Sequence, residues 1–414
     1  MKFPKKKIVE FAKVKGGKRL PKGEQLIAEK TSHPYIRGRD IKDGKVNFIE
    51  PTYLSDEVFQ QIKGYTVRTD DVCITIVGNI GDVAIIPKHL DGANLTENAV
   101  KLVNLLSCDS LYLKYSLLFD QVQTQMKSSA AGAAQPKLGI YKVNAIEIPF
   151  PELKIQQKIR TLLSVYDDLI DNNTRRIAIL EEMARRIYQE WFVKFRFPGH
   201  EQVKMVESEL RLIPQGWEIK SISELIELNP RTLVPKEGIK PFVPMTSLST
   251  DSMVISNIEK RKGNNGSKFK KDDTLFARIT PCLENGKTGF VNFLNNEEVA
   301  FGSTEYIVMR SKTVTPEYVY LTARSDKFRE QAIKSMSGAT GRQRVRIECF
   351  NDFNYVQPSL NSLKTFSDIV KPMFNQIFCL SNENSNLIKT RDLLLPKLIS
   401  GEVDVSHFPN IENV

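Results

Sequence analysis

Two long amphipathic segments share one register, and they constrain the fold of this 414-residue chain more than any other feature. Neither Pro nor Gly occurs from Lys154 to about Val193, where apolar residues recur at alternating steps of four and three. The segment after Pro358 keeps the same alternation, and its Phe366 follows Ile155 by 211 residues. This spacing is typical of coiled-coil helices, which must bury their apolar stripe against a partner.

The simplest partner for each helix is the other one. If the two helices run antiparallel, their midpoints meet and Asn173 faces Asn384, which follows it by the same 211 residues. A buried Asn pair costs stability but fixes the alignment of the helices. The alternative is that either Asn points to solvent at a slip in the register. Pro396 is expected to end the second helix, with Gly401 as a further stop signal.

A weaker repeat extends outside the helices. Residues 69–74 resemble 271–276, residues 96–103 resemble 304–309, and residues 129–137 resemble 335–344, all in the same order. In each half, short strand-like runs lie among Gly, Asn and Asp turns and precede a helix-like stretch, at 111–126 and at 316–333. These patterns predict an α+β protein with mostly antiparallel strands.

The predicted architecture has two similar α/β domains separated by two long helices that form an antiparallel coiled coil, with approximate twofold symmetry. The expected boundaries are a first domain at 1–152, a central helical region at 153–198, a second domain at 199–360, and a C-terminal helical region at 361–414.

The chain carries 59 Lys and Arg against 49 Asp and Glu, a formal net charge of +10. Such an excess attracts polyanions, because each cation placed against a phosphate releases a condensed counterion. The five cysteines form no Cys-x-x-Cys pair, which favours free thiols in a reducing compartment. With no signal peptide and no apolar run long enough to span a membrane, we expect a cytoplasmic protein.

Several strings around the helices resemble the specificity subunit of type I restriction-modification systems, and the resemblance covers nearly the whole chain. They are residues 148–158 (IPFPELKIQQK), 167–172 (DDLIDN), 180–195 (LEEMARRIYQEWFVKF) and 394–403 (LLPKLISGEV). Residues 34–44 and 132–137 look like loops of the family's target-recognition domains.

The resemblance implies that each domain is a target-recognition domain that reads one half of a bipartite site in double-stranded DNA. It implies that the helices set the spacer and carry two modification (methyltransferase) subunits, which restriction (motor-nuclease) subunits can join. S-adenosylmethionine, ATP and Mg²⁺ would then act in those partners, and this chain would hold no cofactor. The target sequence does not carry over, since these domains are the variable part of the family.

Searches for catalytic motifs favour a non-catalytic chain. The nearest approach to an Asp/Asn-Pro-Pro-aromatic methyltransferase motif is Asn229-Pro230-Arg231, which lacks the second Pro and the aromatic residue. Neither a Gly-x-Gly-x-x-Gly motif nor a Walker loop occurs, and residues 78–81 are interpreted as a β-turn. No catalytic or metal-binding residue is therefore assigned. A stand-alone DNA methyltransferase or nuclease, and a basic scaffold protein, remain the alternative hypotheses.

Candidate DNA contacts are long donors on loops, because Arg and Lys can fork onto guanine and Asn and Gln onto adenine. The alternative for each is a solvated side chain or a phosphate contact. The candidates are Arg37, Arg39, Thr75, Asn79, Gln135, Lys137, Arg231, Thr246, Arg278, Thr280, Lys287, Arg342, Gln343, Arg344 and Arg346.

Trp191, Phe192 and Phe195 close the first long helix. Three aromatic residues within five positions exceed what one narrow seam can bury, so we expect part of this cluster to dock a partner subunit. The alternative is that they pack onto the chain's own domains.

Overall fold

A computed structural model describes residues 3–131, 136–339 and 341–408. The chain divides into two compact units. Unit 1 comprises Met1–Ile170 and Asn386–Val414, and unit 2 comprises Asp171–Ser385. Both boundaries fall inside long helices, so that each unit combines one α/β domain with one half of each helix.

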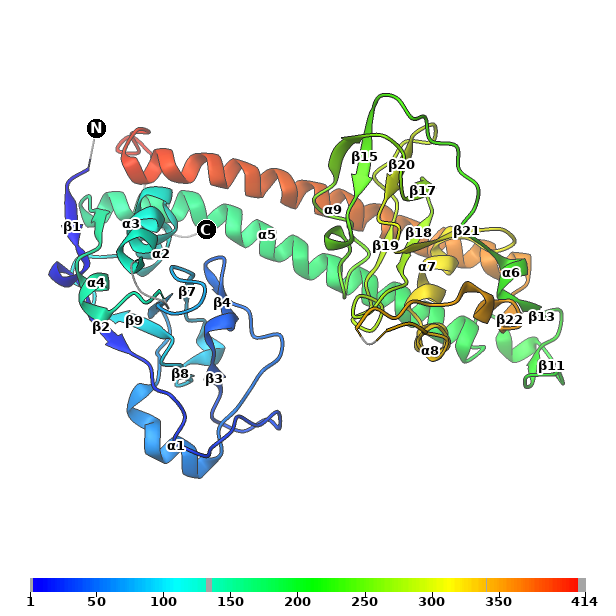
Figure 1. Cartoon of the computed structure of the whole chain (residues 1–414), viewed down its shortest axis with the longest axis horizontal. Helices are drawn as coiled ribbons and strands as arrows, with labels where there is room; N and C mark the ends of the chain where they lie inside the picture. Colours follow the sequence, from blue (N-terminus) through cyan, green and yellow to red (C-terminus); the bar gives the residue numbers. More distant parts are fainter. Residues whose placement is uncertain (1–2, 132–135, 340, 409–414) are drawn as a thin grey trace. The chain divides into compact units, whose positions relative to one another are not determined.

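Unit 1 is built on a four-stranded sheet in which every neighbouring pair of strands is antiparallel, in the order β2-β9-β6-β7 (Figure 1). Its strands are β1 (Lys5–Lys7), β2 (Lys13–Gly16), β3 (Tyr35–Ile36), β4 (Ile41–Lys42), β5 (Lys45–Val46), β6 (Val72–Thr75), β7 (Val83–Ile85), β8 (Asn94–Leu95), β9 (Ala99–Val103) and β10 (Glu147–Pro149). Its short helices are α1 (Asp56–Ile62), α2 (Ser110–Leu118), α3 (Asp120–Ala130) and α4 (Ile140–Asn144).

Unit 2 repeats this sheet in the order β14-β21-β18-β19 and adds a second four-stranded sheet, β16-β15-β20-β17. Its strands are β11 (Met205–Val206), β12 (Ile213–Pro214), β13 (Glu218–Ser221), β14 (Ile226–Leu228), β15 (Ile239–Val243), β16 (Glu259–Lys262), β17 (Ser267–Lys270), β18 (Thr274–Ala277), β19 (Thr288–Phe290), β20 (Val299–Gly302), β21 (Tyr306–Ser311) and β22 (Asn354–Gln357). Its short helices are α6 (Ile222–Leu225), α7 (Pro316–Arg324) and α8 (Asp326–Lys334).

The predicted duplication is confirmed by the matching strand orders and by a shared backbone detail. Asp70 and Asp272, which the sequence comparison aligned, both adopt a left-handed conformation, with φ of 66° and 68°. Each opens the turn into a buried strand, β6 or β18. Few residues other than Gly accept this conformation, and Asp is among them. The same turn has therefore been kept in both copies.

The two helix-like stretches of the domains are each broken once, which the sequence did not predict. In unit 1 the break between α2 and α3 lies at Phe119, and in unit 2 the break between α7 and α8 lies at Ser325. Both residues are extended, and the Ser325 hydroxyl accepts a hydrogen bond from Phe328 N at 3.4 Å. Both copies therefore interrupt the helix at the corresponding place, so the interruption is part of the repeated fold.

The long helices are α5 (Leu153–Tyr188), which ends in a π-turn at Gln189–Val193, and α9 (Leu360–Ser400). They run antiparallel within each unit, as predicted. In unit 1 Lys158 donates to Ser406 O, beyond α9, at 2.7 Å, and Asp167 contacts Arg391 at 2.7 Å. In unit 2 the Trp191 ring lies 6.1 Å from that of Phe366.

The predicted alignment at Asn173 is right to within one residue. Asn173 is buried, and Asn384 Nδ2 donates to Oγ1 of Thr174, the residue after Asn173, at 3.3 Å. The apolar stripe of α5 is less uniform than expected, because Leu169 and Met183, which continue its alternating steps of four and three, are exposed. Buried positions on α5 instead shift to Leu163 and Ala184, since α5 also packs against the domain of each unit.

One local prediction is wrong. Pro396 does not end α9, which continues to Ser400 and stops at Gly401 with φ of 75°. At the other end of the chain, the basic run Lys5–Lys7 forms strand β1 and pairs with β10. Their side chains are exposed, and the Lys6 ammonium lies 4.5 Å from the centre of the Phe150 ring.

Candidate nucleic-acid interface

Three loops of unit 1 converge beyond the end of strand β6, and we call them the unit 1 loop edge: residues 76–82, 96–98 and 136–138. Ile76 N donates to Asn98 O at 2.8 Å, and Leu138 N donates to Ile76 O at 3.0 Å. Val77 and Lys137 form an isolated β-bridge. The predicted contacts Asn79 and Lys137 are therefore brought together, and both are exposed.

Thr75 shapes this edge from inside. It is buried, its hydroxyl donates to Asn79 O, and Asp82 N donates to the hydroxyl at 3.0 Å. Gly78 and Gly81 have φ of 78° and 91°, which confirms the predicted turn. A buried hydroxyl used in this way has no surface for DNA, so Thr75 is not carried forward as a contact. Gln135 lies outside the described residues.

Arg37 and Arg39 lie on a turn beside the same edge, where the Cβ of Asn98 approaches Gly38. The half-buried Arg37 guanidinium donates to both Asp40 carboxylate oxygens, at 3.0 and 2.9 Å, and to Glu50 O at 2.6 Å. Arg39 is exposed and pairs with the Glu50 carboxylate at 2.7 Å. Arg37 therefore holds the turn together, while Arg39 is the more accessible donor.

Unit 2 builds a matching edge, the unit 2 loop edge, from residues 278–287, 303–305, 337–339 and 341–346. Arg278 N donates to Glu305 O at 3.0 Å, and Val345 N donates to Arg278 O at 2.8 Å. These two bonds correspond to the pair that Ile76 makes in unit 1. Thr280 N donates to Gln343 O, and Gln343 N donates to the Thr280 hydroxyl, each at 3.1 Å. The β-bridge Ile279–Arg344 makes Arg344 the backbone counterpart of Lys137.

The remaining candidates of unit 2 differ in accessibility. Arg342, Arg344 and Arg346 are exposed on this edge. Lys287 Nζ donates to Met245 O at 3.1 Å, which places the exposed Thr246 beside it. Arg231 is exposed on the loop after β14, and no contact among the described residues ties it to the edge.

A pair of carboxylates at the loop edges was missed, because the sequence search considered only donors. Glu97 accepts a hydrogen bond from Arg19 Nε at 2.8 Å, and Glu305 accepts three from Arg344 at 2.7–3.0 Å. The Arg344 hydrogen bonds lower the pKa of Glu305, so this carboxylate is ionised at neutral pH. The repeated Thr-Glu dipeptide, at residues 96–97 and 304–305, was the available signal.

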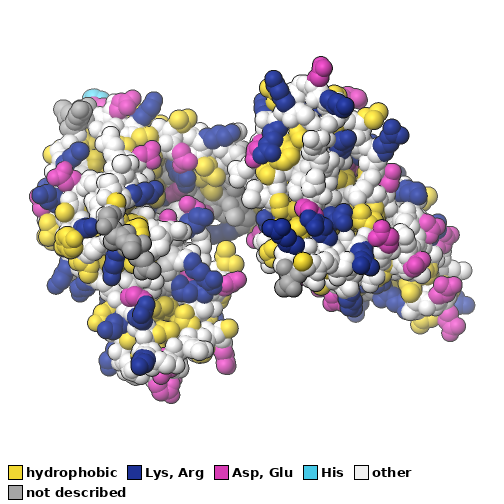
Figure 2. All heavy atoms as spheres, in the orientation of Figure 1, with side chains coloured by type: hydrophobic (Ala, Val, Ile, Leu, Met, Phe, Trp, Pro, Cys, Tyr) yellow, Lys and Arg dark blue, Asp and Glu magenta, His cyan; other side chains and the backbone are white. Residues whose placement is uncertain are grey.

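Overall charge does not by itself delimit the interface. Figure 2 shows Lys and Arg side chains dispersed over the visible face and interspersed with Asp and Glu. The loop edges are therefore identified by converging donors rather than by a continuous basic strip.

The aromatic cluster at the end of α5 lies in the core of unit 2, not on its surface. Trp191, Phe192 and Phe195 are all buried, and Phe192 lies 4.8 Å from the Phe366 ring and 5.0 Å from the Tyr318 ring. The packing alternative accounts for them, and the predicted docking role of these side chains is corrected accordingly.

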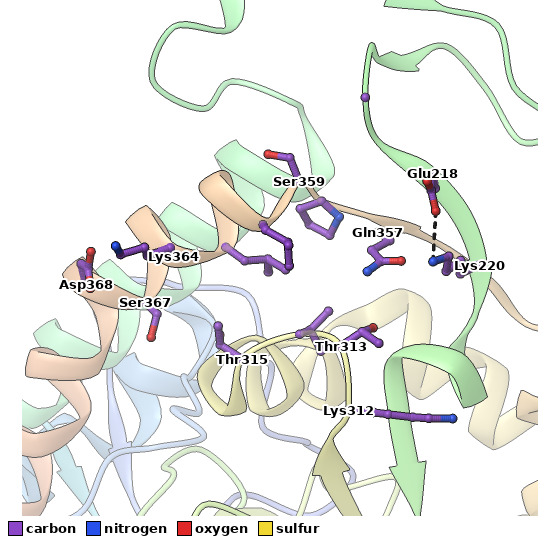
Figure 3. A pocket seen from close by; sticks show the side chains of 15 residues that line it. Glu218, Lys220, Lys312, Thr313, Thr315, Gln357, Ser359, Lys364, Ser367 and Asp368 are labelled. Carbon is purple, nitrogen blue, oxygen red and sulfur yellow. Dashed lines mark ion pairs between the residues drawn. The ribbon is translucent and has the colours of Figure 1, made fainter.

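A cleft of about 790 Å³ in unit 2 lies between β13, the start of α7 and the start of α9 (Figure 3). The residue of α5 that corresponds to Ser367 in the lining of this cleft is the larger Gln156, which is buried in unit 1 and accepts from Asp109 N at 3.0 Å. Ser367 donates to the buried Glu317 at 3.1 Å. A carboxylate already at the first turn of α7 disfavours a second anion there.

The duplicated α/β domains and paired helix segments define an internally repeated class of protein with donor-rich loop edges. The family model of the type I restriction modification DNA specificity domain matches residues 2–182 and 214–390, once on each repeat. The chain therefore belongs to this family. Among the described residues there is no group of three or more His, Cys, Asp or Glu placed to hold a metal ion, and no helix is apolar and long enough to span a membrane.

Similar proteins agree with this assignment. The MjaIX and MjaVIII type I restriction enzyme specificity subunits of Methanocaldococcus jannaschii are 24% and 21% identical to the chain. The alignments cover 97% of this chain and 93% of the first relative, and 94% and 95% for the second. The S subunit of a type I restriction-modification system from M. genitalium has a similar fold, with a TM-score of 0.56 at 17% identity over 96% of both chains.

Proposed function

We propose that this chain is the DNA-specificity subunit of a type I restriction-modification complex, in which each unit reads one half of a bipartite target. The observation that carries the proposal is the repeated loop edge, since both units expose Arg, Lys or Asn donors at corresponding places on their matching sheets. Two similar readers joined by paired helices suit two half-sites separated by an unread spacer.

The chain itself is proposed to be non-catalytic. Two methyltransferase subunits would dock on it and methylate adenine with S-adenosylmethionine, and motor-nuclease subunits would join them with ATP and Mg²⁺. The decisive experiment is sequencing of the methylated bases in host DNA, with and without the gene for this chain. A split motif that disappears with the chain supports the proposal, and an unchanged set of methylated motifs contradicts it.

Two other functions give different results in simple assays. A stand-alone methyltransferase or nuclease would turn over DNA when the pure chain is supplied with S-adenosylmethionine and Mg²⁺. A basic scaffold would show no specific DNA binding and no steep fall of affinity with salt, whereas counterion release predicts that fall for a DNA-binding subunit.

The helices are expected to set the spacer length. Inserting about two helical turns (roughly seven residues) both between Ile170 and Asp171 and between Ser385 and Asn386 adds about 10 Å of helix. At about 3.4 Å per base pair, the preferred spacer should lengthen by roughly three base pairs. The measurement is the spacer in the methylated motif. Insertion into one helix alone, which shifts the register, serves as the control and should abolish methylation.

A further inference from the structure

The carboxylates Glu97 and Glu305 lie in matching loops of the two units, one position out of step, since the backbone counterpart of Glu305 is Asn98, the residue after Glu97. Glu97 lies between β8 and β9, and Glu305 lies between β20 and β21. Strands β9 and β21 take the same place in the two matching sheets, and β8 and β20 each pair in parallel with an earlier strand. Both carboxylates therefore stand at the loop edges.

Each carboxylate holds an arginine, but the two arginines come from unrelated loops. Arg344 belongs to the segment before β22, whereas Arg19 belongs to the loop after β2. The backbone counterpart of Arg344 in unit 1 is Lys137, which lacks a planar fork. Arg19 thus supplies, from elsewhere in the chain, the guanidinium that its unit lacks at that point.

Stability does not explain this repeated pair. The Arg19 side chain is 82% exposed and that of Arg344 is 48% exposed. Exposed ion pairs contribute little to folding, because water and salt screen them and because two long side chains must be ordered. What the two units share is an accessible guanidinium held in a defined orientation.

The orientation is suited to a nucleobase edge. Glu305 engages Nε and Nη2 of Arg344, which leaves the remaining N–H groups of the fork for another acceptor. An arginine in this state can donate two hydrogen bonds to O6 and N7 of guanine in the major groove. Because the carboxylate already orders the side chain, less rotamer entropy is lost on binding.

The same carboxylate disfavours a simple phosphate contact. An ionised Glu next to the arginine repels the DNA backbone, and the pair as a whole is neutral, so it releases few counterions. A neutral ion pair whose guanidinium still has unengaged N–H groups is better suited to reading a base than to neutralising a phosphate.

We propose that Arg19 and Arg344 each read a guanine, one in each half of the bipartite target, and that Glu97 and Glu305 are the positioning residues that hold them. This inference rests on the proposed function and adds the residues and the base class to it.

The test is motif sequencing with Arg19→Gln and Arg344→Gln, expressed together with the modification subunits. Each variant should relax one guanine position in one half-site by roughly 5- to 150-fold, the range for one bidentate base contact, and leave the other half-site unchanged. Arg261→Gln is the matched control, because Arg261 pairs with Glu259 at 2.6 Å on strand β16. It should leave both half-sites intact.

Glu305→Gln tests the positioning role. Freed from its counter-charge, Arg344 should strengthen binding of the full chain to a non-cognate duplex, while preference for the guanine position falls. A merely structural defect would weaken both kinds of binding and lower the melting temperature. For Arg344→Gln, we expect the slope of log affinity against log salt concentration to be unchanged. Loss of a phosphate contact would instead reduce the magnitude of that slope by about one.

The outcomes separate this inference from the proposed function. If the wild-type chain directs no split motif, the proposed function fails. If the wild-type chain directs one but Arg19→Gln and Arg344→Gln leave it unchanged, or relax a position that is not guanine, then the present inference is overturned and the proposed function stands.

Discussion

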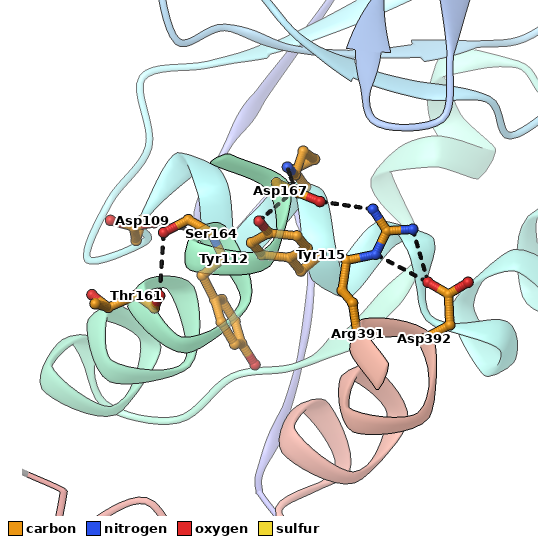
Figure 4. Close-up of polar contacts among 9 residues, drawn as sticks. Asp109, Tyr112, Tyr115, Thr161, Ser164, Asp167, Arg391 and Asp392 are labelled. Atoms are coloured by element: carbon orange, nitrogen blue, oxygen red, sulfur yellow. Dashed lines mark hydrogen bonds and ion pairs between the residues drawn. The ribbon is translucent and has the colours of Figure 1, made fainter. Parts of the chain in front are cut away.

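Replacing Asp167 by Asn will destabilise unit 1 by about 3–5 kcal/mol, the usual cost of removing one partner of a buried ion pair. Asp167 Oδ2 accepts hydrogen bonds from Lys114 Nζ at 2.9 Å and from Tyr115 Oη at 2.7 Å, and Oδ1 pairs with Arg391 at 2.7 Å (Figure 4). This carboxylate therefore ties α2 of the domain to both long helices within unit 1.

The buried Lys114 makes the loss of stability in Asp167→Asn severe. Its side chain is only 5% exposed, and burial lowers its pKa, with Asp167 opposing that shift. Without the carboxylate, Lys114 must either stay charged in a poorly solvated place or lose its proton. Denaturant unfolding monitored by amide hydrogen exchange should show lower protection of the backbone amides in α2 but not in α7. Asp168→Asn, at the exposed neighbour, is the control; equal losses in the two variants would contradict the prediction.

The same network gives a pH dependence. Burial opposes ionisation of Asp167, but the Lys114 charge and the hydrogen bonds from Tyr115, Lys114 and Arg391 outweigh it and lower its pKa from 3.8 to about 2. Because the folded-state pKa is depressed, the stabilisation is complete above about pH 4 and is lost as the pH falls towards 2. Between pH 6 and pH 3 the wild type should lose more stability than Asp167→Asn. Parallel pH profiles would exclude this linkage.

The sequence predicted the repeat, the pairing of helices and the Asn alignment because these depend on periodic patterns that tertiary contacts reinforce. The prediction at Pro396 failed because burial of the residues after it overrides the local rule that a proline ends a helix. A proline inside a helix costs about 3 kcal/mol, but ending α9 there would forgo the burial of Leu398 and Ile399, each worth about 1.5–3 kcal/mol.

The candidate interface was only partly predictable, because the accessibility of a donor is a tertiary property. Thr75 and Asn79 are four residues apart, yet one is buried and the other is exposed. Arg37 was selected as a donor, but Asp40, three residues later, already engages its guanidinium. Arg19 was overlooked because its importance comes from Glu97, a partner distant in sequence that only the fold brings close.

Phe192→Ala will destabilise unit 2 by about 3–5 kcal/mol, since a large buried ring leaves a cavity that the surroundings fill only partly. The Phe192 ring lies 4.8 Å from that of Phe366, 5.0 Å from that of Tyr318 and 6.0 Å from that of Trp217. It thereby joins both long helices of unit 2 to the domain. Thermal melting with hydrogen exchange should place the loss in α7 and leave α2 protected.

This variant also separates core packing from partner docking, the two roles considered for the aromatic cluster. A docking side chain would lose affinity for the methyltransferase subunit when truncated but leave the stability of the free chain unchanged. Truncating a core side chain instead lowers the stability of the free chain. At a low temperature, where the variant is still folded, the variant should bind the partner as the wild type does. Val193→Ala, at the exposed next residue, should alter neither property. If Phe192→Ala weakens partner binding with no loss of stability, the packing interpretation is wrong, because a ring that supports the core cannot be removed without energetic cost.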